Sequence, residues 1–213
     1  MVNKLEKIHD QYLNSLLRGN RQMCSIIAKQ YLAENNSIKD LYEDVFKGAL
    51  YEVGLMWENN KISVATEHLA TAITEGILNE LYQELEIPPT QKHKVVLTCV
   101  ESELHQVGIK MVTDVFEMNA WESYFLGTGI PINELIKFIK EKDPHVLALS
   151  MSIFFNYQNL VHMIEILRRE FPKLKIIVGG QGFVHKKEGN FKKIENVKYI
   201  SDLYELDNYL KTI

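Results

Sequence analysis

A pair of prolines divides this sequence into two parts with different hydrophobic patterns. Pro88 and Pro89 follow Ile87. Proline lacks an N–H, and the residue before it avoids the α conformation, so a helix has to end here. Residues 1–86 show only helical periodicity, whereas from Lys94 onward short β-branched runs alternate with helical segments. We therefore predict two domains, over residues 1–87 and 93–213.

Four helices are predicted before the prolines. Ser37 with Asp40 resembles a capping box at the start of the third, and Ser63 is a favourable N-cap for the fourth, which runs to about Glu86. The apolar stripes of the first three helices are Leu5-Ile8-Tyr12-Leu16, Met23-Ile26-Ile27-Tyr31 and Leu41-Val45-Ala49-Val53. Short connections make neighbouring helices antiparallel, which predicts a four-helix bundle.

Five strands that alternate with helices are predicted after the prolines. The strands are expected at Val95–Val100, Glu122–Leu126, Val146–Ser150, Lys175–Val178 and Lys198–Ile200. The helices are expected to begin near Gly108, Pro131, Asn156 and His185, with a last one at Asp202–Leu210. This α/β pattern predicts a parallel, doubly wound sheet of the flavodoxin-like type. Ligands of such sheets bind at the carboxyl ends of the strands.

Composition excludes several classes of protein. The 213 residues contain no stretch near the twenty apolar residues of a membrane span, and the N-terminus lacks the apolar block of a signal peptide, so we expect a cytoplasmic protein without membrane contact. Cys24 and Cys99 are too few for a disulfide framework and are expected to be buried, reduced thiols. The net charge is -4 and the basic runs are short, so no nucleic-acid-binding face is expected.

The loop after the first predicted strand contains an acid, a histidine and a glycine. Glu103, two residues before His105, is placed to accept a ring N–H, which would fix the tautomer of the imidazole and raise its basicity as a metal ligand. Gly108 is expected to let backbone pack closely where the next helix begins. Without other signals, such an acid and histidine are more often a solvated pair.

Small residues follow the third and fourth predicted strands. Ser150 and Ser152 follow the third strand, and Gly179 and Gly180 follow the fourth. A serine hydroxyl next to two glycines, which have no side chains, leaves space for a planar ring between the two strand ends. Ser150 is expected to hydrogen-bond the edge of that ring. Glycines at a strand end are also common in ordinary turns.

These three loops together resemble a known signature. Glu103-x-His105-x-x-Gly108, then Ser150, then Gly179-Gly180 is similar to the Asp-x-His-x-x-Gly, Ser-x-Leu and Gly-Gly motifs of cobalamin-binding domains in methionine synthase, corrinoid methyltransferase proteins and cobalamin-dependent regulators. The resemblance implies adenosylcobalamin or methylcobalamin as cofactor, with His105 as the lower ligand of cobalt in place of the cofactor's own dimethylbenzimidazole. It further implies that Glu103 orients His105 and that Ser150, Gly179 and Gly180 line a slot for the nucleotide tail.

This sequence departs from the signature at two positions. Glu103 stands where Asp is usual, which adds one methylene and changes the reach of the carboxylate toward His105. Ser152 stands where Leu is common, which changes the wall of the slot.

The helical part carries a second resemblance. Trp57, followed by Glu67 and His68, is similar to the helical cap of light-sensing cobalamin-dependent transcriptional repressors. The resemblance implies that Trp57 packs over the upper face of the corrin and that Glu67 and His68 approach the upper cobalt ligand. Considered alone, Trp57 would be a core aromatic and Glu67 an ordinary first-turn acid. Glu58 replaces a histidine that the photoreceptors carry after the tryptophan.

Two functions are consistent with this resemblance. The first is a cobalamin-binding sensor or regulatory protein, and the alternative is a corrinoid methyl carrier of a methyltransferase system. We expect no direct DNA binding, because no basic recognition helix precedes the first helix, and no turnover of a substrate by the chain alone. The expected partners are a regulatory protein or a methyltransferase, together with further copies of the chain.

Two other ligands were considered for the same loops. A flavin or nucleotide does not explain His105, because a phosphate cradle favours a Gly/Ser/Thr-rich loop after the first strand. A zinc site on Glu103 and His105 would have only two ligands near in sequence.

Overall fold

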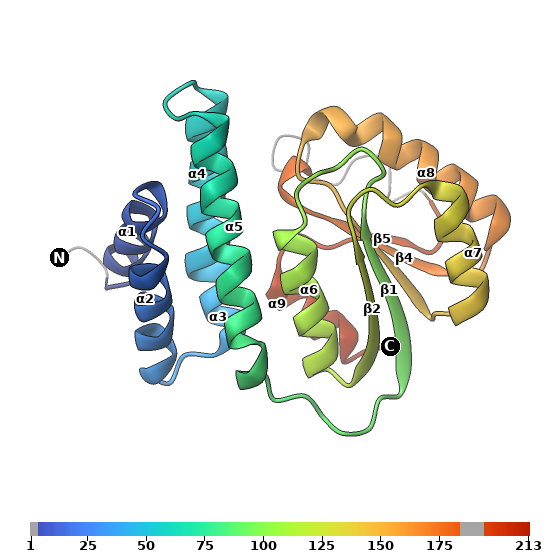
Figure 1. Cartoon of the computed structure of the whole chain (residues 1–213). Helices are drawn as coiled ribbons and strands as arrows, with labels where there is room; N and C mark the ends of the chain where they lie inside the picture. The colour runs from blue at the N-terminus through green and yellow to red at the C-terminus, as the bar shows by residue number, and fades with distance from the viewer. Residues whose placement is uncertain (1–3, 184–193) are drawn as a thin grey trace. The chain divides into compact units, whose positions relative to one another are not determined.

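The computed structural model describes residues 4–183 and 194–213, and the chain divides into two compact units, Met1–Leu85 and Glu86–Ile213. The first unit is helical and the second is an α/β unit (Figure 1). The chain passes from one to the other after the last helical turn of the first unit, through the segment that contains Pro88 and Pro89.

The helical unit contains the four predicted helical segments. Its elements are α1 (Lys4–Leu17), α2 (Arg21–Ala33), α3 (Ile38–Asp40), the π-helical segment η1 (Leu41–Lys47), α4 (Gly48–Glu58), α5 (Val64–Leu81) and a 3-10 turn η2 (Tyr82–Glu84). From α3 to α4 the backbone stays helical, and Ser37 and Asp40 form a capping box at its start. The predicted third helix is therefore present, but its first half is π-helical, which an apolar stripe does not reveal.

The core of the helical unit is built on stacked aromatic rings. The Tyr12 and Phe46 ring centroids lie 4.9 Å apart, and Tyr42 stacks on Phe46 at 5.8 Å. The Tyr12 hydroxyl lies 3.2 Å from that of Thr74, and burial raises the pKa of Tyr12 far above its usual value. The polar end of a buried ring is therefore paired, as buried polar groups generally are.

The buried face of α2 differs from the predicted one. Ile27 and Tyr31 of the predicted stripe are buried, as expected, whereas Met23 and Ile26 are exposed and Cys24 and Ala28 are buried in their place. The buried side keeps the helical spacing but is centred one residue later than expected. The apolar residues of α2 cover a wide part of its surface, so the sequence alone does not determine which side is buried. Packing against the neighbouring helices determines it.

The α/β unit has the predicted parallel sheet. Its strands are β1 (His93–Cys99), β2 (Trp121–Gly127), β3 (Val146–Ser150), β4 (Lys175–Gly179) and β5 (Val197–Tyr199). They pair in parallel in the order β2-β1-β3-β4-β5. The predicted fold class, a helical region followed by a five-stranded parallel doubly wound sheet, is confirmed.

Helices cover both faces of this sheet. The elements are α6 (Val107–Met118), α7 (Ile132–Lys142), η3 (Phe154–Asn156), α8 (Tyr157–Glu170), η4 (Gln181–Phe183) and α9 (Leu203–Leu210). Figure 1 shows α6 and α9 on one side of the sheet and α7 and α8 on the other. The helix predicted near His185 lies outside the described residues. The carboxyl ends of β1, β3 and β4 meet at one edge, where the predicted site residues follow them.

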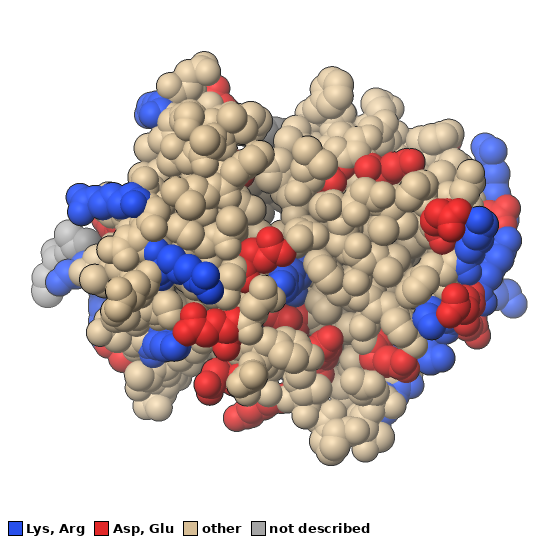
Figure 2. Space-filling view, viewed as in Figure 1, with Lys and Arg blue, Asp and Glu red and all other residues tan. Residues whose placement is uncertain are grey.

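The surface carries its charges in mixed groups. On the face drawn in Figure 2, basic side chains around α7 and α8 lie among acidic ones. Lys137 pairs with Glu134 at 2.7 Å, and Lys140 pairs with Glu170 at 2.8 Å. Within the part of the chain that the structure describes, no helix is both long and apolar enough to cross a bilayer.

The aromatic stack generates a stability prediction. Phe46→Ala removes a fully buried ring and leaves a cavity, so the free energy of unfolding should fall by about 3–5 kcal/mol in urea denaturation. Leu55→Ala, at an exposed position of α4, is the control and should change it by less than about 0.5 kcal/mol. Similar losses in both variants would show that the stack does not organise this core.

Candidate functional site

The loop after β1 folds around the side chain of Glu103. This carboxylate is fully buried, and its Oε1 accepts the backbone N–H of Leu104 at 3.0 Å and of His105 at 3.1 Å. The ring Nδ1 of His105 lies 2.5 Å from the same oxygen. Glu103 therefore hydrogen-bonds both the backbone and the imidazole of His105, across the extra methylene that distinguishes it from Asp.

The second oxygen of Glu103 binds the loop after β3. Oε2 accepts the backbone N–H of Ser152 at 2.8 Å and of Ile153 at 3.0 Å, and the side-chain amide of Asn156 at 3.2 Å. One carboxylate thus ties together the loops that follow two neighbouring strands. Ser152 takes part through its backbone. Sequence reasoning used Asn156 only as a helix start, and a buried amide just before α8 gave no separate signal.

The ionisation of Glu103 fixes the tautomer of His105. Burial alone raises the pKa of Glu103, but hydrogen bonds from the His105 ring and from backbone N–H groups, chiefly those of Ile153 and Ser152, lower it to about 2. A carboxylate only accepts hydrogen bonds, so Nδ1 of His105 carries the hydrogen. In the neutral ring the lone pair is then on Nε2, the nitrogen suited to ligate a metal.

The loops after β3 and β4 are joined by their backbones. Met151 N donates to Gly179 O, and Gly182 N donates to Met151 O, both at 3.0 Å. Gly180 has φ +112°, and a Cβ there would lie 2.4 Å from Met151 O. Only glycine fits this position. Ser150, a residue only 5% exposed, ends β3 directly opposite Gly179 of β4 in the sheet register.

The physical reason predicted for Gly108 is wrong. A Cβ at Gly108 would meet no described atom within 4 Å, so close packing of the chain does not require glycine there. Close backbone approach occurs instead at Gly179, where a Cβ would lie 2.9 Å from Ile200 O, and at Gly180. The start of α6 therefore borders open space rather than another part of the described unit.

The predicted residues of the helical unit occupy the end of α4 and the start of α5. Trp57 lies in the last turn of α4 and is partly buried, so it is not a core aromatic. Glu67 is 7% exposed and accepts a hydrogen bond from Thr71 Oγ1 at 2.9 Å. Its Oε2 lies 2.5 Å from Nδ1 of His68, whose side chain is 67% exposed. Glu67 therefore orients an exposed imidazole and is not a solvated first-turn acid.

Both cysteines are buried and free of disulfides. The thiol of Cys99 donates to the carbonyl oxygen of His105 at 3.3 Å, and burial raises its pKa to about 12. Burial also raises the pKa of Cys24, to about 11. Both sulfurs stay protonated near neutral pH, and Cys99 supports the backbone of the histidine loop as a thiol.

The arrangement at the carboxyl edge fits a cofactor that brings its own metal. It presents a single imidazole in a fixed tautomer, a largely buried serine at a strand end, and a neighbouring glycine pair. One imidazole suits a metal whose other positions are occupied by a macrocycle.

Comparison with protein families identifies this cofactor. Residues 93–194 match a B12 binding domain, and residues 8–82 match a second family that is also described as a B12 binding domain. The first match includes all the predicted site residues of the α/β unit, and the second includes Trp57, Glu67 and His68. The chain is therefore a cobalamin-binding protein, and the predicted cofactor is confirmed.

The chain is also similar to individual corrinoid proteins in sequence and in fold. The chain is 24% identical over 148 residues to dimethylamine corrinoid protein 3 of Methanosarcina acetivorans, which covers 67% of this chain and 68% of the relative. It has the fold of the monomethylamine corrinoid protein of Methanosarcina barkeri, with a TM-score of 0.81, 17% identity and coverage of 98% and 99% of the two chains. A methanol:cobalamin methyltransferase complex from Methanosarcina barkeri matches with a TM-score of 0.52, 13% identity and coverage of 97% and 79%. These matches do not support the resemblance to light-sensing regulators.

The low pKa of Glu103 predicts how stability depends on pH. A carboxylate whose pKa falls on folding stabilises the protein above its unfolded pKa, and this stability is lost as the pH drops toward the folded pKa. A shift from 4.5 to about 2 corresponds to about 3 kcal/mol. The free energy of unfolding should decline by that order between pH 5 and pH 2 in urea denaturation, and the decline should be smaller in Glu103→Gln. The exposed neighbour Glu101 is the control, and Glu101→Gln should keep the full decline.

The glycines generate a paired prediction. Gly180→Ala combines a positive φ with an overlap against Met151 O, so it should lower the free energy of unfolding by about 1–3 kcal/mol or more. Gly108→Ala, inside helix α6 and beside open space, should raise it by roughly 0.5–1 kcal/mol. Thermal or urea unfolding of the two variants measures both effects. A destabilised Gly108→Ala variant would contradict the conclusion that a Cβ at position 108 meets no other atoms.

Proposed function

We propose that this chain is a corrinoid methyl carrier that exchanges methyl groups with separate methyltransferases in the cytoplasm. The observation that carries the proposal is the imidazole of His105, held by Glu103 at the ligand edge of a B12 binding domain. The names of the relatives, which are corrinoid proteins for methylamines, favour the carrier over the sensor function that we also considered.

In this proposal His105 is the lower ligand of cobalt. Cobalamin, when bound, supplies a cobalt centre that can accept and release a methyl group. Glu103 keeps the hydrogen of His105 on Nδ1 and so directs Nε2 to the metal. Because the same carboxylate also binds Ser152 and Asn156, the ring is held by two loops instead of one.

The other loops of the edge hold the nucleotide tail of the cofactor. Ser150 offers a hydroxyl at the end of β3, and the adjacent Gly179 and Gly180 offer backbone without side chains. Gly108 borders open space at the start of α6, which leaves room for the cofactor beside that helix. Ser152, in place of the usual Leu, forms part of the slot wall.

The helical unit contributes groups for the upper face. Trp57 is partly buried and retains surface for packing against a corrin ring. Glu67, which also accepts a hydrogen bond from Thr71, orients the exposed imidazole of His68, and in this proposal that imidazole would approach the upper ligand as the resemblance of the cap implies. The same pair is the observation that favours the second candidate, a cobalamin-dependent sensor whose cap responds to the upper ligand.

The partner in this proposal is a methyltransferase, because a carried methyl group has to be delivered and removed by enzymes that bind its donor and acceptor. The fold shared with a chain of the methanol:cobalamin methyltransferase complex supports a partner of this kind. On its own, the loaded protein should hold one methyl group and turn over no substrate.

The first experiment tests the ligand of cobalt. The protein is loaded with cobalamin, reduced to cobalt(II), and its electron paramagnetic resonance spectrum is recorded with natural-abundance and 15N-labelled histidine. We expect the nitrogen splitting to change with the label in the wild type, and we expect this label effect to disappear in His105→Ala, whether the lower position is then empty or filled by dimethylbenzimidazole. His162→Ala, at an exposed position of α8, is the matched control and should keep it. A label effect that survives in His105→Ala would remove His105 from the site.

The second experiment separates carrier from sensor. Protein loaded with methylcobalamin is mixed with a methyltransferase encoded beside it and a thiol acceptor, and methylated thiol is quantified. Protein loaded with adenosylcobalamin is sized in darkness and after green light. Methyl transfer without a change of size supports the carrier. A light-driven change of size without methyl transfer would replace the carrier with the sensor.

A further inference from the structure

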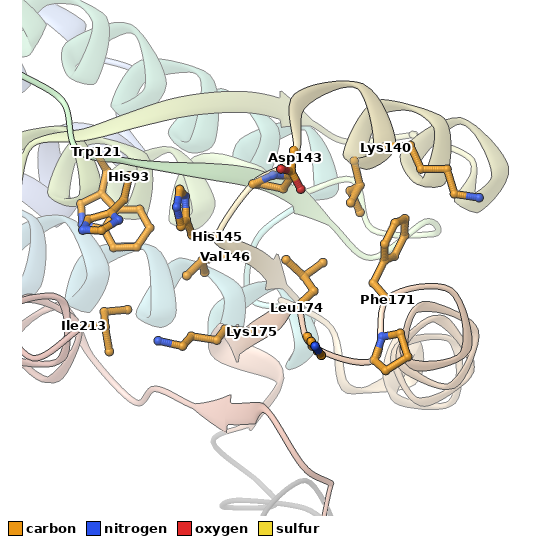
Figure 3. Close-up of a pocket in the computed structure, with 14 residues that line it drawn as sticks. His93, Trp121, Lys140, Asp143, His145, Val146, Phe171, Leu174, Lys175 and Ile213 are labelled. Atoms are coloured by element: carbon orange, nitrogen blue, oxygen red, sulfur yellow. The ribbon is translucent and has the colours of Figure 1, made fainter.

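The α/β unit has a cavity at the edge opposite the cobalamin loops. Its volume is about 740 Å³, and it is lined by the first residues of four strands, which are His93, Trp121, Val146 and Lys175 (Figure 3). The loops that enter β3 and β4 complete the wall. Cavities that bind small molecules usually measure about 300–1,000 Å³. The size therefore suits a small organic ligand, and no part of the cobalamin proposal uses this edge.

Aromatic rings gather at one end of this cavity. The ring centroids of His93 and Trp121 lie 5.0 Å apart, and those of His93 and His145 lie 5.0 Å apart at 83°. Figure 3 shows these three rings together and Phe171 at the other end, with Leu174 between them. Ring edges and apolar side chains thus line most of the wall, which suits a planar, largely apolar body.

The polar groups of the aromatic end are hydrogen-bond donors. Trp121 is 2% exposed, and its indole N–H makes no hydrogen bond to any residue that the structure describes. His145 accepts the backbone N–H of Lys94 on Nδ1 at 3.1 Å, so its neutral ring carries the hydrogen on Nε2. Trp121 lines the cavity, so an indole N–H without a protein acceptor is available to donate to a ligand there.

The charged groups of the cavity are mostly cationic. Lys173 and Lys175 line it, and neither forms an ion pair with a described residue. Lys140 is already paired with Glu170 at 2.8 Å, and its ammonium lies 5.8 Å from the Phe171 ring centroid, at the end of the cavity away from His93 and Trp121 (Figure 3). Asp143 is the acidic residue of the lining. Two lysines without acidic partners, together with the N–H donors of Trp121 and His145, favour the binding of an anionic ligand.

The helices around the cavity limit the charge of that anion. Helices α7 and α8 end at Lys142 and Glu170, so both present their carboxyl ends to this edge. A helix carries partial negative charge at its carboxyl end, whereas phosphate sites typically use the amino end. A singly charged carboxylate is therefore favoured over a phosphate dianion.

We propose that this cavity binds a small aromatic carboxylic acid. The ring of the ligand packs between His145 and Leu174, and its carboxylate accepts hydrogen bonds from the indole N–H of Trp121 and from Lys175. The site is independent of the corrinoid site, because the two lie at opposite edges of one sheet.

The chain offers a direct probe of this site. It contains two tryptophans, Trp57 and Trp121, so a 15N–1H correlation spectrum of the full-length protein has two indole signals, which Trp57→Phe assigns. Benzoate should shift the Trp121 signal saturably, with a dissociation constant in the millimolar range or tighter, and should leave Trp57 in place. Benzamide, its neutral counterpart of the same shape, should bind at least about fivefold more weakly.

Lysine variants test the charge. The double variant Lys173→Gln/Lys175→Gln should weaken benzoate binding by at least about fivefold, whereas Lys137→Gln on the outer surface of α7 should not change it. An unshifted Trp121 signal at millimolar benzoate, equal binding of benzamide, or a double variant that binds like the wild type would overturn the proposal. Tighter binding of phenyl phosphate than of benzoate would overturn the assignment to carboxylic acids. The readout does not involve cobalt, so the result is separate from the fate of the methyl-carrier proposal.

Discussion

The buried carboxylate of Glu103 is the interaction on which the cofactor edge depends. A charge removed from water is strongly unfavourable unless hydrogen bonds replace the lost hydration. Here five N–H groups besides the His105 ring donate to it, from the loops after β1 and β3. These hydrogen bonds to the Glu103 carboxylate also fix the conformation of each loop. The position of His105 is therefore a consequence of how two neighbouring strands end, and not of its own loop alone.

The extra methylene of Glu103 explains how one side chain serves both loops. The carboxylate belongs to the loop after β1, and Oε1 turns back to the backbone and ring of His105. Oε2 extends across to Ser152 and Asn156 beyond the neighbouring strand β3. The change from Asp to Glu, which the sequence marks as a departure, thus coexists with a complete set of hydrogen bonds.

The sequence predicted the sheet and the cofactor loops but not several local features. Strand alternation and the loop order depend on short-range patterns, which is why β1 to β5 and the motif around His105 were found. The π-helical segment at Leu41–Lys47 was missed because it shares its apolar spacing with an α-helix. Asn156 was missed as a site residue because its role comes from a contact with Glu103, 53 residues away in the chain. The reason for Gly108 was wrong because a glycine's surroundings are set by tertiary structure.

The contrast between the two edges of the sheet follows from its parallel topology. Every helix that follows a strand begins at the carboxyl edge and ends at the amino edge. Helix α8 therefore places its positive amino end on the side of Glu103 and its negative carboxyl end on the side of Lys173. A buried anion is favoured at the first edge, and unpaired lysines are tolerated at the second. The same arrangement that holds an ionised carboxylate beside the His105 ring thus permits a cationic cavity at the far edge. There the helix ends offset part of the lysine charge and leave room for one negative charge on a ligand.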